Sequence, residues 1–239
     1  MSTHIHREAA RSPAHVTIMP SRGPRPGAAV RSAMLVADPD PIVDLAFPVR
    51  GAPLPLDHGF ALFSALCRVL PALHEQPTWG VHPVLGQRRD RGLHLLPASR
   101  IKLRLPLAEI AVVMPLAQAT LDVAGATVSL GFPQVFPLTP AASIRARFVT
   151  ISGFQDAEPL TLALERQLAE LPGLAQAPGT LDITLGRRRI CEIHGKRIVG
   201  FAVGLTGLHA EASLAVQRHG LGGRRHMGAG IFVPPGRRG

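Results

Sequence analysis

Apolar residues recur along this chain at two spacings, every third or fourth residue in some segments and every second residue in others. Between residues 57 and 70 the apolar positions Phe63, Leu66, Cys67 and Leu70 have helical spacing, and Pro71 follows them. We therefore predict a helix over 57–70. The same reasoning predicts the other elements of the first half: strands at 42–49, 93–96, 99–105 and 126–130, and a short helix at 109–117. Their order, β-α-β-β-α-β, is the ferredoxin-like order.

The second half repeats this order. A predicted helix over 158–171 carries Leu160, Leu164, Leu168 and Leu171 on one side. The remaining predicted elements are strands at 143–152, 181–185, 187–193, 197–205 and 231–233, and a helix at 208–219. We expect an α+β fold of tandem ferredoxin-like (RRM-like) domains, an N-terminal one over 41–132 and a C-terminal one over 141–235. The proline-rich stretch 133–140 would link them.

Residues 1–40 show little periodicity and carry five arginines among Pro, Gly and Ser, so we expect a disordered basic arm there. The chain has no secretory apolar region and no apolar run of the roughly 18 residues that span a bilayer. Its two cysteines, Cys67 and Cys191, lie outside any C-x-x-C pattern. The cysteine usage fits a reduced cytoplasmic protein, and the missing apolar run argues against a membrane partner.

The net charge of +10 predicts a polyanionic partner rather than a particular fold. Nucleic acid is the first candidate, and an anionic membrane surface is the lesser one. The chain has one tryptophan, nine phenylalanines and no tyrosine. Because single-strand binding by base stacking needs exposed aromatic rings, we expect cations and shape to dominate recognition here.

Cations alternate with apolar residues in two predicted strands. Arg100, Lys102 and Arg104 occupy every second position of one strand, and Arg145 and Arg147 do the same in another. Side chains alternate across a sheet, so each set would share one face opposite an apolar face. Like charges side by side destabilise a strand, which favours a phosphate backbone as the group that offsets their repulsion.

The most informative segment is the glycine-rich loop at 220–230. Gly222 and Gly223 let the backbone approach a ligand closely, and Arg224, Arg225 and His226 follow them directly. The loop runs from a predicted helix to a predicted strand, whereas Walker and dinucleotide loops run from strand to helix. We therefore expect it to contact the phosphate backbone of a nucleic acid.

Other nucleic-acid and metal signatures are missing from the sequence. The aromatic run of RNA-recognition domains, the helix-turn-helix pattern and zinc-finger spacings do not occur. Three histidines, His58, His74 and His82, lie close together in sequence but form no H-x-x-x-H pair with a companion carboxylate. We expect no metal site and no cofactor.

Several short segments resemble the CRISPR-associated endoribonucleases that process repeat RNA, in particular the MYXAN subtype. The most specific of them is Gly-Leu-Gly-Gly-Arg-Arg-His-Met-Gly-Ala-Gly-Ile-Phe-Val-Pro at 220–234. The others are Leu-Pro-Leu-Asp-His at 54–58, Gly-Val-His-Pro at 80–83, Leu-Arg-Leu-Pro at 103–106 and Arg-Phe-Val-Thr-Ile at 147–151. The resemblance covers about residues 40 to 235.

This resemblance implies a metal-independent RNase that cuts precursor RNA into mature guide RNAs. The 2′-hydroxyl of the RNA attacks the adjacent phosphate and leaves a 2′,3′-cyclic phosphate and a 5′-hydroxyl. The expected partners are CRISPR repeat RNA, the guide RNA product and other subunits of a CRISPR interference complex.

The chemistry requires a base, an acid and cations, and histidine is the usual proton carrier. The family places that histidine in or just after the first helix, where our order of preference is His82, His74 and His58. His82 lies in a glycine-flanked loop, His74 follows the helix, and the helix dipole would keep His58 neutral. Arg224, Arg225, His226, Gly222, Gly223, Arg100, Lys102, Arg104, Arg145 and Arg147 are the residues expected at the RNA.

Two other functions remain open on sequence alone. The chain could be a non-catalytic RNA-binding subunit of a CRISPR ribonucleoprotein, with the same fold and loop but without cleavage. It could also be a basic ribosome- or DNA-associated protein, which only its charge supports. That third reading predicts binding that ignores the sequence of the repeat.

Overall fold

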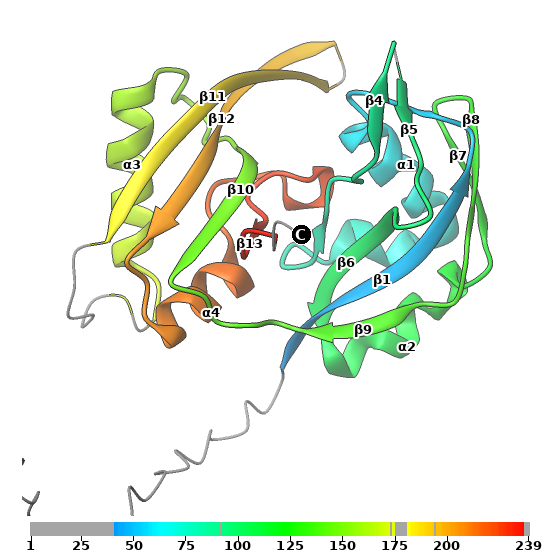
Figure 1. The fold of residues 1–239 in the computed structure, drawn as a ribbon, viewed down its shortest axis with the longest axis horizontal. Helices are drawn as coiled ribbons and strands as arrows, with labels where there is room; N and C mark the ends of the chain where they lie inside the picture. The colour runs from blue at the N-terminus through cyan, green and yellow to red at the C-terminus, as the bar shows by residue number, and fades with distance from the viewer. Residues whose placement is uncertain (1–40, 91, 173, 175–180, 194, 237–239) are drawn as a thin grey trace, which may run out of the picture. The chain divides into compact units, whose positions relative to one another are not determined.

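A computed structural model of the protein describes residues 41–90, 92–172, 174, 181–193 and 195–236. The expected basic arm over 1–40 lies outside the described residues. The described part is a mixed α+β structure whose sheets are built from antiparallel strand pairs (Figure 1). None of its helices combines the length and the apolar character needed to cross a bilayer.

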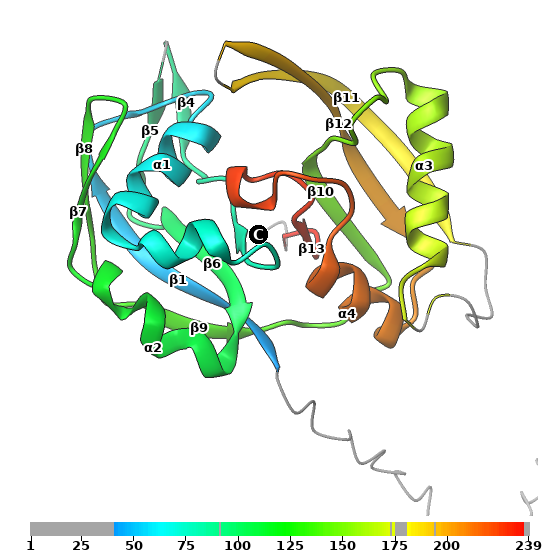
Figure 2. The ribbon, with the colours of Figure 1, turned by 180° about the vertical axis from the view of Figure 1, so that it is seen from behind.

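The first half is organised around β1 (Ile42–Gly51), the central strand of a sheet in the order β3-β6-β1-β8-β7. The helix α1 (Gly59–Val69) packs against this sheet, and Figures 1 and 2 show α1 and α2 on the same face of it. The other sheet strands are β3 (Gly80–Val81), β6 (Arg100–Pro106), β7 (Thr120–Val123) and β8 (Ala126–Leu130). The predicted second helix is split into 3₁₀ helix η2 (Leu107–Glu109), α2 (Ile110–Val113) and 3₁₀ helix η3 (Met114–Leu116), with Pro115 at the start of the last.

One predicted strand belongs to a different sheet. We expected 93–96 beside 99–105, but β5 (Gly92–His94) pairs with β2 (Leu54–Pro55) and β4 (Gln87–Arg89) in a small sheet of its own. A turn redirects the chain, because Ser99 bonds back to Leu96 through both its main chain and its hydroxyl. β3, which has only two residues, takes the edge position beside β6 instead.

The second half has the predicted order of elements. They are β10 (Ser143–Val149), α3 (Ala157–Ala169), β11 (Asp182–Ile193), β12 (Lys196–Thr206), α4 (Ala210–His219) and β13 (Phe232–Val233). Its sheet runs β11-β12-β10-β13. The two strands predicted at 181–185 and 187–193 are one strand, because a register shift between Leu185 and Arg188 absorbs one residue without ending the pairing with β12.

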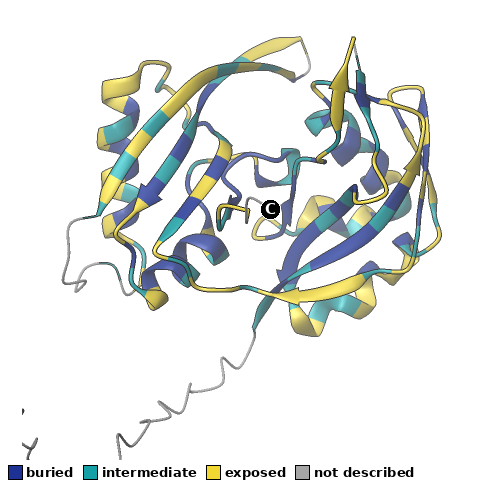
Figure 3. Cartoon of the chain, viewed as in Figure 1, coloured by how far each residue is buried: buried dark blue, intermediate teal, exposed yellow. Residues whose placement is uncertain are grey.

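Each half has its own hydrophobic core. Phe47, Leu66 and Leu103 belong to the first core, and Ile144 and Val203 belong to the second. Burial follows the periodicity of the sequence, and Figure 3 shows it alternating along β10. In this strand Ile144, Ala146 and Val149 are buried, Phe148 is half-buried, and Arg145 and Arg147 are exposed. Each sheet therefore stabilises its own half. Polar contacts of Arg104 and the packing of Met227 against the first core join the halves.

The segment between the halves is bonded at both ends. Contrary to the expected linker, β9 (Gln134–Pro137) pairs with β1. The next residues bond to the second half: Gln217 Nε2 donates to the Thr139 carbonyl at 2.8 Å, and the Ala141 amide donates to Ser213 Oγ at 3.0 Å. The connection thus forms part of both halves.

Candidate active site and nucleic-acid interface

The glycine-rich loop connects the two halves. It begins where α4 ends at Gly220, whose φ of 66° lies in the left-handed region. The amides of Gly223 and Gly230 donate to carbonyls of the second half, at Thr150 (3.0 Å) and Phe148 (2.8 Å). On the other side, a Cβ on Gly59 at the start of α1 would collide with the Met227 carbonyl, so the loop lies directly against the first half.

The two loop arginines point in different directions. Arg224 is exposed, as expected of a phosphate ligand. Arg225 was expected at the RNA as well, but it is only 9% exposed and donates from Nη2 to the Arg218 carbonyl at 2.8 Å. Burial, reinforced by the nearby Arg104, lowers its pKa to about 10. A Cβ on Gly220 would collide with the Arg225 guanidinium, so this glycine makes room for the buried side chain.

Arg104 is also buried, with 1% of its surface exposed. Its Nε and Nη2 donate to the Asp44 carboxylate at 2.7 and 3.0 Å, and its Nη1 donates to the carbonyls of Gln217 and Phe232, both at 2.8 Å. Arg104 was expected at the RNA together with Arg100 and Lys102, but its guanidinium bonds to groups of the protein itself. Strand register sets Asp44 directly opposite it, and the second half covers what would be an open face.

His82 belongs to the same cluster. It is 7% exposed, and its Nε2 lies 3.1 Å from Asp44 Oδ1. Burial lowers the pKa of His82, against the opposing effect of Asp44, so its ring is neutral and donates to the carboxylate. Burial tends to raise the pKa of Asp44, but His82 and Arg104 outweigh it and keep the carboxyl ionised.

His58 is held by two internal hydrogen bonds. Its Nδ1 donates to the Pro55 carbonyl at 3.0 Å, and its Nε2 accepts from the Val84 amide at 3.1 Å. The side chain is 4% exposed, and burial is the main cause of its lowered pKa. The sequence suggested the helix dipole as the reason for a neutral His58, whereas here burial keeps the ring neutral and both nitrogens are occupied.

His74 is the exposed member of the three histidines. It lies in the 3₁₀ helix η1 (Pro71–Glu75), directly after α1. Phe63 stacks with His74 at a centroid distance of 5.9 Å and with His226 of the glycine-rich loop at 5.2 Å. His226 Nε2 donates to the Gln76 carbonyl at 2.6 Å, and burial lowers its pKa. The pattern of α1 identified Phe63 only as an apolar helix position, so its role in placing two histidines was missed.

On another side of the same loop, four arginines line a pocket of about 270 Å³ that residues of both halves form. They are Arg88 of β4, Arg147 of β10, Arg189 of β11 and Arg224 of the loop. Burial lowers the pKa of Arg147, and the charges of Arg189 and Arg88 add to this effect, so the cations repel one another. A phosphate group would offset this repulsion.

The sequence identified Arg147 and Arg224 in this pocket but not Arg88 or Arg189. Both missed residues stand in short runs of arginine, at 88–89 and 187–189, which is the only local signal for them. Asp57 borders the pocket as well, and its Oδ2 accepts from the Glu192 amide at 2.8 Å. This bond joins the start of α1 to β11 and helps to form the pocket wall.

The remaining expected RNA contacts are spread over both sheets. Arg145 is exposed on β10, and Arg100 and Lys102 are half-buried on β6. Of the two glycines, Gly223 is exposed, while the Gly222 amide already donates to Gln167 Oε1 at 2.8 Å. The pocket and the glycine-rich loop therefore bring together only some of the residues predicted to contact RNA.

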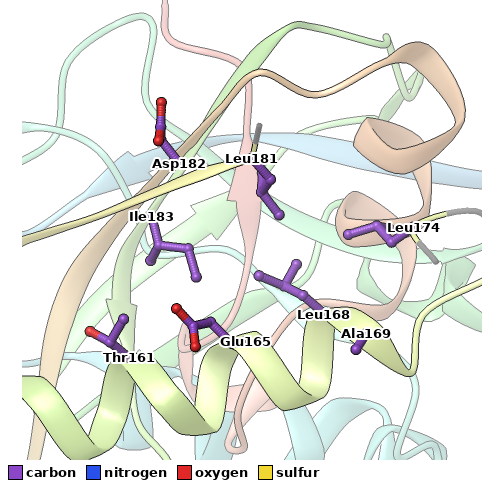
Figure 4. A pocket seen from close by; sticks show the side chains of 8 residues that line it. All are labelled: Thr161, Glu165, Leu168, Ala169, Leu174, Leu181, Asp182 and Ile183. Carbon is purple, nitrogen blue, oxygen red and sulfur yellow. The ribbon is translucent and has the colours of Figure 1, made fainter. Parts of the chain in front are cut away.

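A second cavity, of about 420 Å³, lies between α3 and β11 (Figure 4). Glu165 and Asp182 line it together with apolar side chains such as Leu168 and Ile183. Two carboxylates would repel a phosphate backbone, so we do not assign this cavity to nucleic acid.

Comparison with known proteins gives concordant results. A family model described as Cas6 Crispr matches residues 43–237. The chain is 47% identical over 195 residues to the CRISPR-associated endonuclease Cas6 of Myxococcus xanthus (strain DK1622), and the match covers 82% of each protein.

Solved structures share the fold. A CRISPR associated protein Cas6 has a TM-score of 0.56 at 12% identity, over 82% of this chain and 100% of that one. The product of a Cas6-related gene from Pyrococcus furiosus has a TM-score of 0.56 at 10% identity, over 83% of this chain and 100% of that one. At such identities the likeness concerns the fold alone.

Proposed function

The chain belongs to the Cas6 family, and from that premise we propose that it is an endoribonuclease that cuts CRISPR repeat RNA into guide RNAs. One observation carries the proposal. The glycine-rich loop has a pocket of four arginines on one side and the exposed His74, with His226, on another. A phosphate binder and a proton carrier thus lie beside the same loop.

We propose that both halves are ferredoxin-like. The second half has the sheet order β13-β10-β12-β11, which is the fourth, first, third and second strand of its β-α-β-β-α-β unit. The first half contains the order β8-β1-β6-β3, which is the same once β3 is counted as the second strand. The domain limits 41–132 and 141–235 stay a proposal, supported by the two separate cores.

The arginine pocket would bind the phosphates next to the bond that is cut. Arg147, Arg189 and Arg224 would neutralise the backbone, and the exposed Gly223 would let it approach the loop main chain. The same cations would stabilise the negative charge that develops on the phosphate during cleavage. Arg104 and Arg225 would act indirectly, by holding the loop in place.

His74 is the residue that we propose for proton transfer, ahead of His82 and His58. A base removes the proton of the 2′-hydroxyl, O2′ forms a bond to phosphorus, the P–O5′ bond breaks, and an acid protonates the departing 5′-oxygen. The products are a 2′,3′-cyclic phosphate and a 5′-hydroxyl. His74 is exposed, whereas His58 has both ring nitrogens bonded and His82 is buried against Asp44. The proposed steps use only side chains of this protein and no metal ion.

The test is cleavage of the host's repeat RNA in excess EDTA, beside a copy with a 2′-deoxy substitution at the cut site. We expect cleavage of the first and not of the second. His74→Ala should lower the single-turnover rate by about 10²–10⁴-fold with unchanged RNA affinity. His94→Ala, a half-buried histidine on β5, is the matched control and should cut normally. An active His74→Ala variant would contradict the assignment.

A second candidate is a non-catalytic RNA-binding subunit. The internal bonds of His58 and His82 favour it, because they remove two of the three candidate proton carriers. Tight binding of repeat RNA without cleavage of either substrate would support this alternative and refute the enzyme. For both candidates we propose a cytoplasmic protein that stays with its RNA and with other subunits of a CRISPR complex.

A further inference from the structure

The segment that includes β9 exposes large apolar side chains. Phe132 is 65% exposed, and Val135 and Phe136 are each 47% exposed. Figure 3 shows β9 exposed along its length, although the strand pairs with the buried β1. An exposed group of large apolar residues on a folded protein commonly marks a binding surface.

Strand register places Phe136 on the face of the sheet that α1 and α2 leave uncovered. Phe136 lies opposite Asp44, whereas the core residue Leu45 lies opposite Val135. Lys102 of β6 is on the same uncovered face, because its Nζ lies 5.9 Å from the centroid of the Phe136 ring. An aromatic ring and a lysine thus adjoin each other on this face.

Phe132 lies near the opposite end of β1 from Phe136, just before β9 begins. The amide of its neighbour Gly131 donates to the Pro48 carbonyl at 2.8 Å, and Pro48 lies opposite Arg100 on β6. Arg100 is held in place by donating from Nη1 to the carbonyls of Pro97 and Ser99. Phe136 therefore has Lys102 across β1 from it, and Phe132 directly follows the residue that bonds to Pro48, which lies opposite Arg100.

The charge of this face is positive. In the paired rows of β6, β1 and β9 the only carboxylate is that of Asp44, and Arg104 and His82 already bond to it. The positive charges of Lys102 and Arg100 on this face are therefore not neutralised by a carboxylate of these strands. Interfaces between proteins are usually depleted of lysine at their centre. Aromatic rings beside a lysine therefore favour a nucleic acid over a protein as the ligand, because its phosphates are negative and its bases are flat and apolar.

We propose that Phe132 and Phe136, with Lys102 and Arg100, form a second RNA-binding surface that stacks bases of a single-stranded segment of the substrate. The proposal rests on the proposed function, because it takes repeat RNA as the ligand. Paired bases are stacked on each other, whereas an unpaired base can lie on an aromatic ring while cations contact its phosphates. The surface uses residues outside the arginine pocket, so it would add affinity for the strand that flanks the cut region.

Binding to two RNAs tests the inference: the repeat with its single-stranded flanks, and a copy trimmed to the structured region. F132A/F136A should bind the flanked RNA about tenfold or more weakly and the trimmed RNA as well as the unaltered protein. F132L/F136L keeps an apolar surface without rings and should lose the same affinity. Leu162→Ala, which alters a 49% exposed leucine on α3, should change neither. Thermal melting confirms that each variant is folded.

The outcomes separate the two proposals. If the unaltered protein cuts repeat RNA but the phenylalanine variants bind flanked RNA normally, the stacking surface is refuted and the proposed function stands. If the leucine variant binds flanked RNA normally and the alanine variant does not, ring stacking is refuted and the patch contacts the RNA through apolar surface alone. If the unaltered protein neither binds nor cuts repeat RNA, both proposals are refuted.

Discussion

Replacing Arg104 with methionine tests how far the two halves depend on each other. Methionine keeps an unbranched apolar stem but removes both bonds to the Asp44 carboxylate and the bonds to the carbonyls of Gln217 and Phe232. Asp44 is 13% exposed, so its charge would stay largely buried without the guanidinium. Loss of one partner of a buried ion pair costs about 3–5 kcal/mol. For a chain of this size the melting temperature should fall by about 6–20 °C.

Urea unfolding followed by two probes measures both the size and the location of this effect. Trp79 is the single tryptophan and is fully buried in the first core, so its fluorescence reports on the first half. Far-UV circular dichroism reports on both halves. In Arg104→Met both signals should change at lower urea, and the fluorescence should change at least as early as the dichroism, because the unpaired Asp44 is buried in the first half. Arg145→Met, at an exposed position of β10, should change the unfolding free energy by less than about 0.5 kcal/mol. If Arg104→Met is no less stable than this control, the reasoning is refuted.

Three further predictions follow from the loop, the pocket and a buried histidine. Gly220→Ala should lower the unfolding free energy by about 1–3 kcal/mol and slow cleavage, because the φ of Gly220 is positive and a Cβ there would collide with the buried Arg225 guanidinium. Gly125 also has a positive φ but open space around it, so Gly125→Ala should lose less stability and keep full activity. Arg147→Ala should weaken RNA binding and reduce the slope of log affinity against log salt by about 0.7–0.9, because one phosphate contact is lost. The control Arg166→Ala on α3 should leave the slope unchanged. Equal slopes for both variants would show that Arg147 does not contact the RNA. Burial lowers the pKa of His58 in the folded protein, so the unfolded state takes up the proton at a higher pH than the folded state does. The stability that His58 contributes is therefore complete above its unfolded pKa of about 6.5 and is lost as the pH falls below that value. Urea unfolding between pH 7.5 and 5 should therefore show a smaller loss for His58→Asn than for the unaltered protein, and identical losses would contradict this.

The helices and most strands could be predicted because their signals are local. The leucines of α3 and the alternating arginines of β10 define faces that the structure preserves. Periodicity states which residues share a face, but it does not state what covers that face. Arg104 was misjudged for this reason, since its carbonyl partners Gln217 and Phe232 lie more than 100 residues away.

The candidate site was only partly predictable for the same reason. The glycine-rich loop could be found because its composition is unusual within eleven residues. The choice among the histidines could not, because it depends on contacts made in three dimensions. His82 is buried against Asp44, 38 residues earlier, and His74 adjoins His226 through the ring of Phe63. Arg88 and Arg147 line the same pocket only because β4 pairs into its small sheet and this sheet lies close to β10 and β11.

The connection between the halves leaves the protein almost no slack. β9 is hydrogen-bonded to β1 as far as Pro137, and Thr139 and Ala141 are bonded to residues of α4. Hinge motions need a few residues that can change their main-chain angles freely, and only Leu138 and Pro140 lack such an anchor in this short stretch. Opening the halves would therefore break several hydrogen bonds together. The proposed RNA ligand therefore has to fit an arginine pocket whose width is already set, so we expect the conformational adjustment on binding to fall mainly to the RNA.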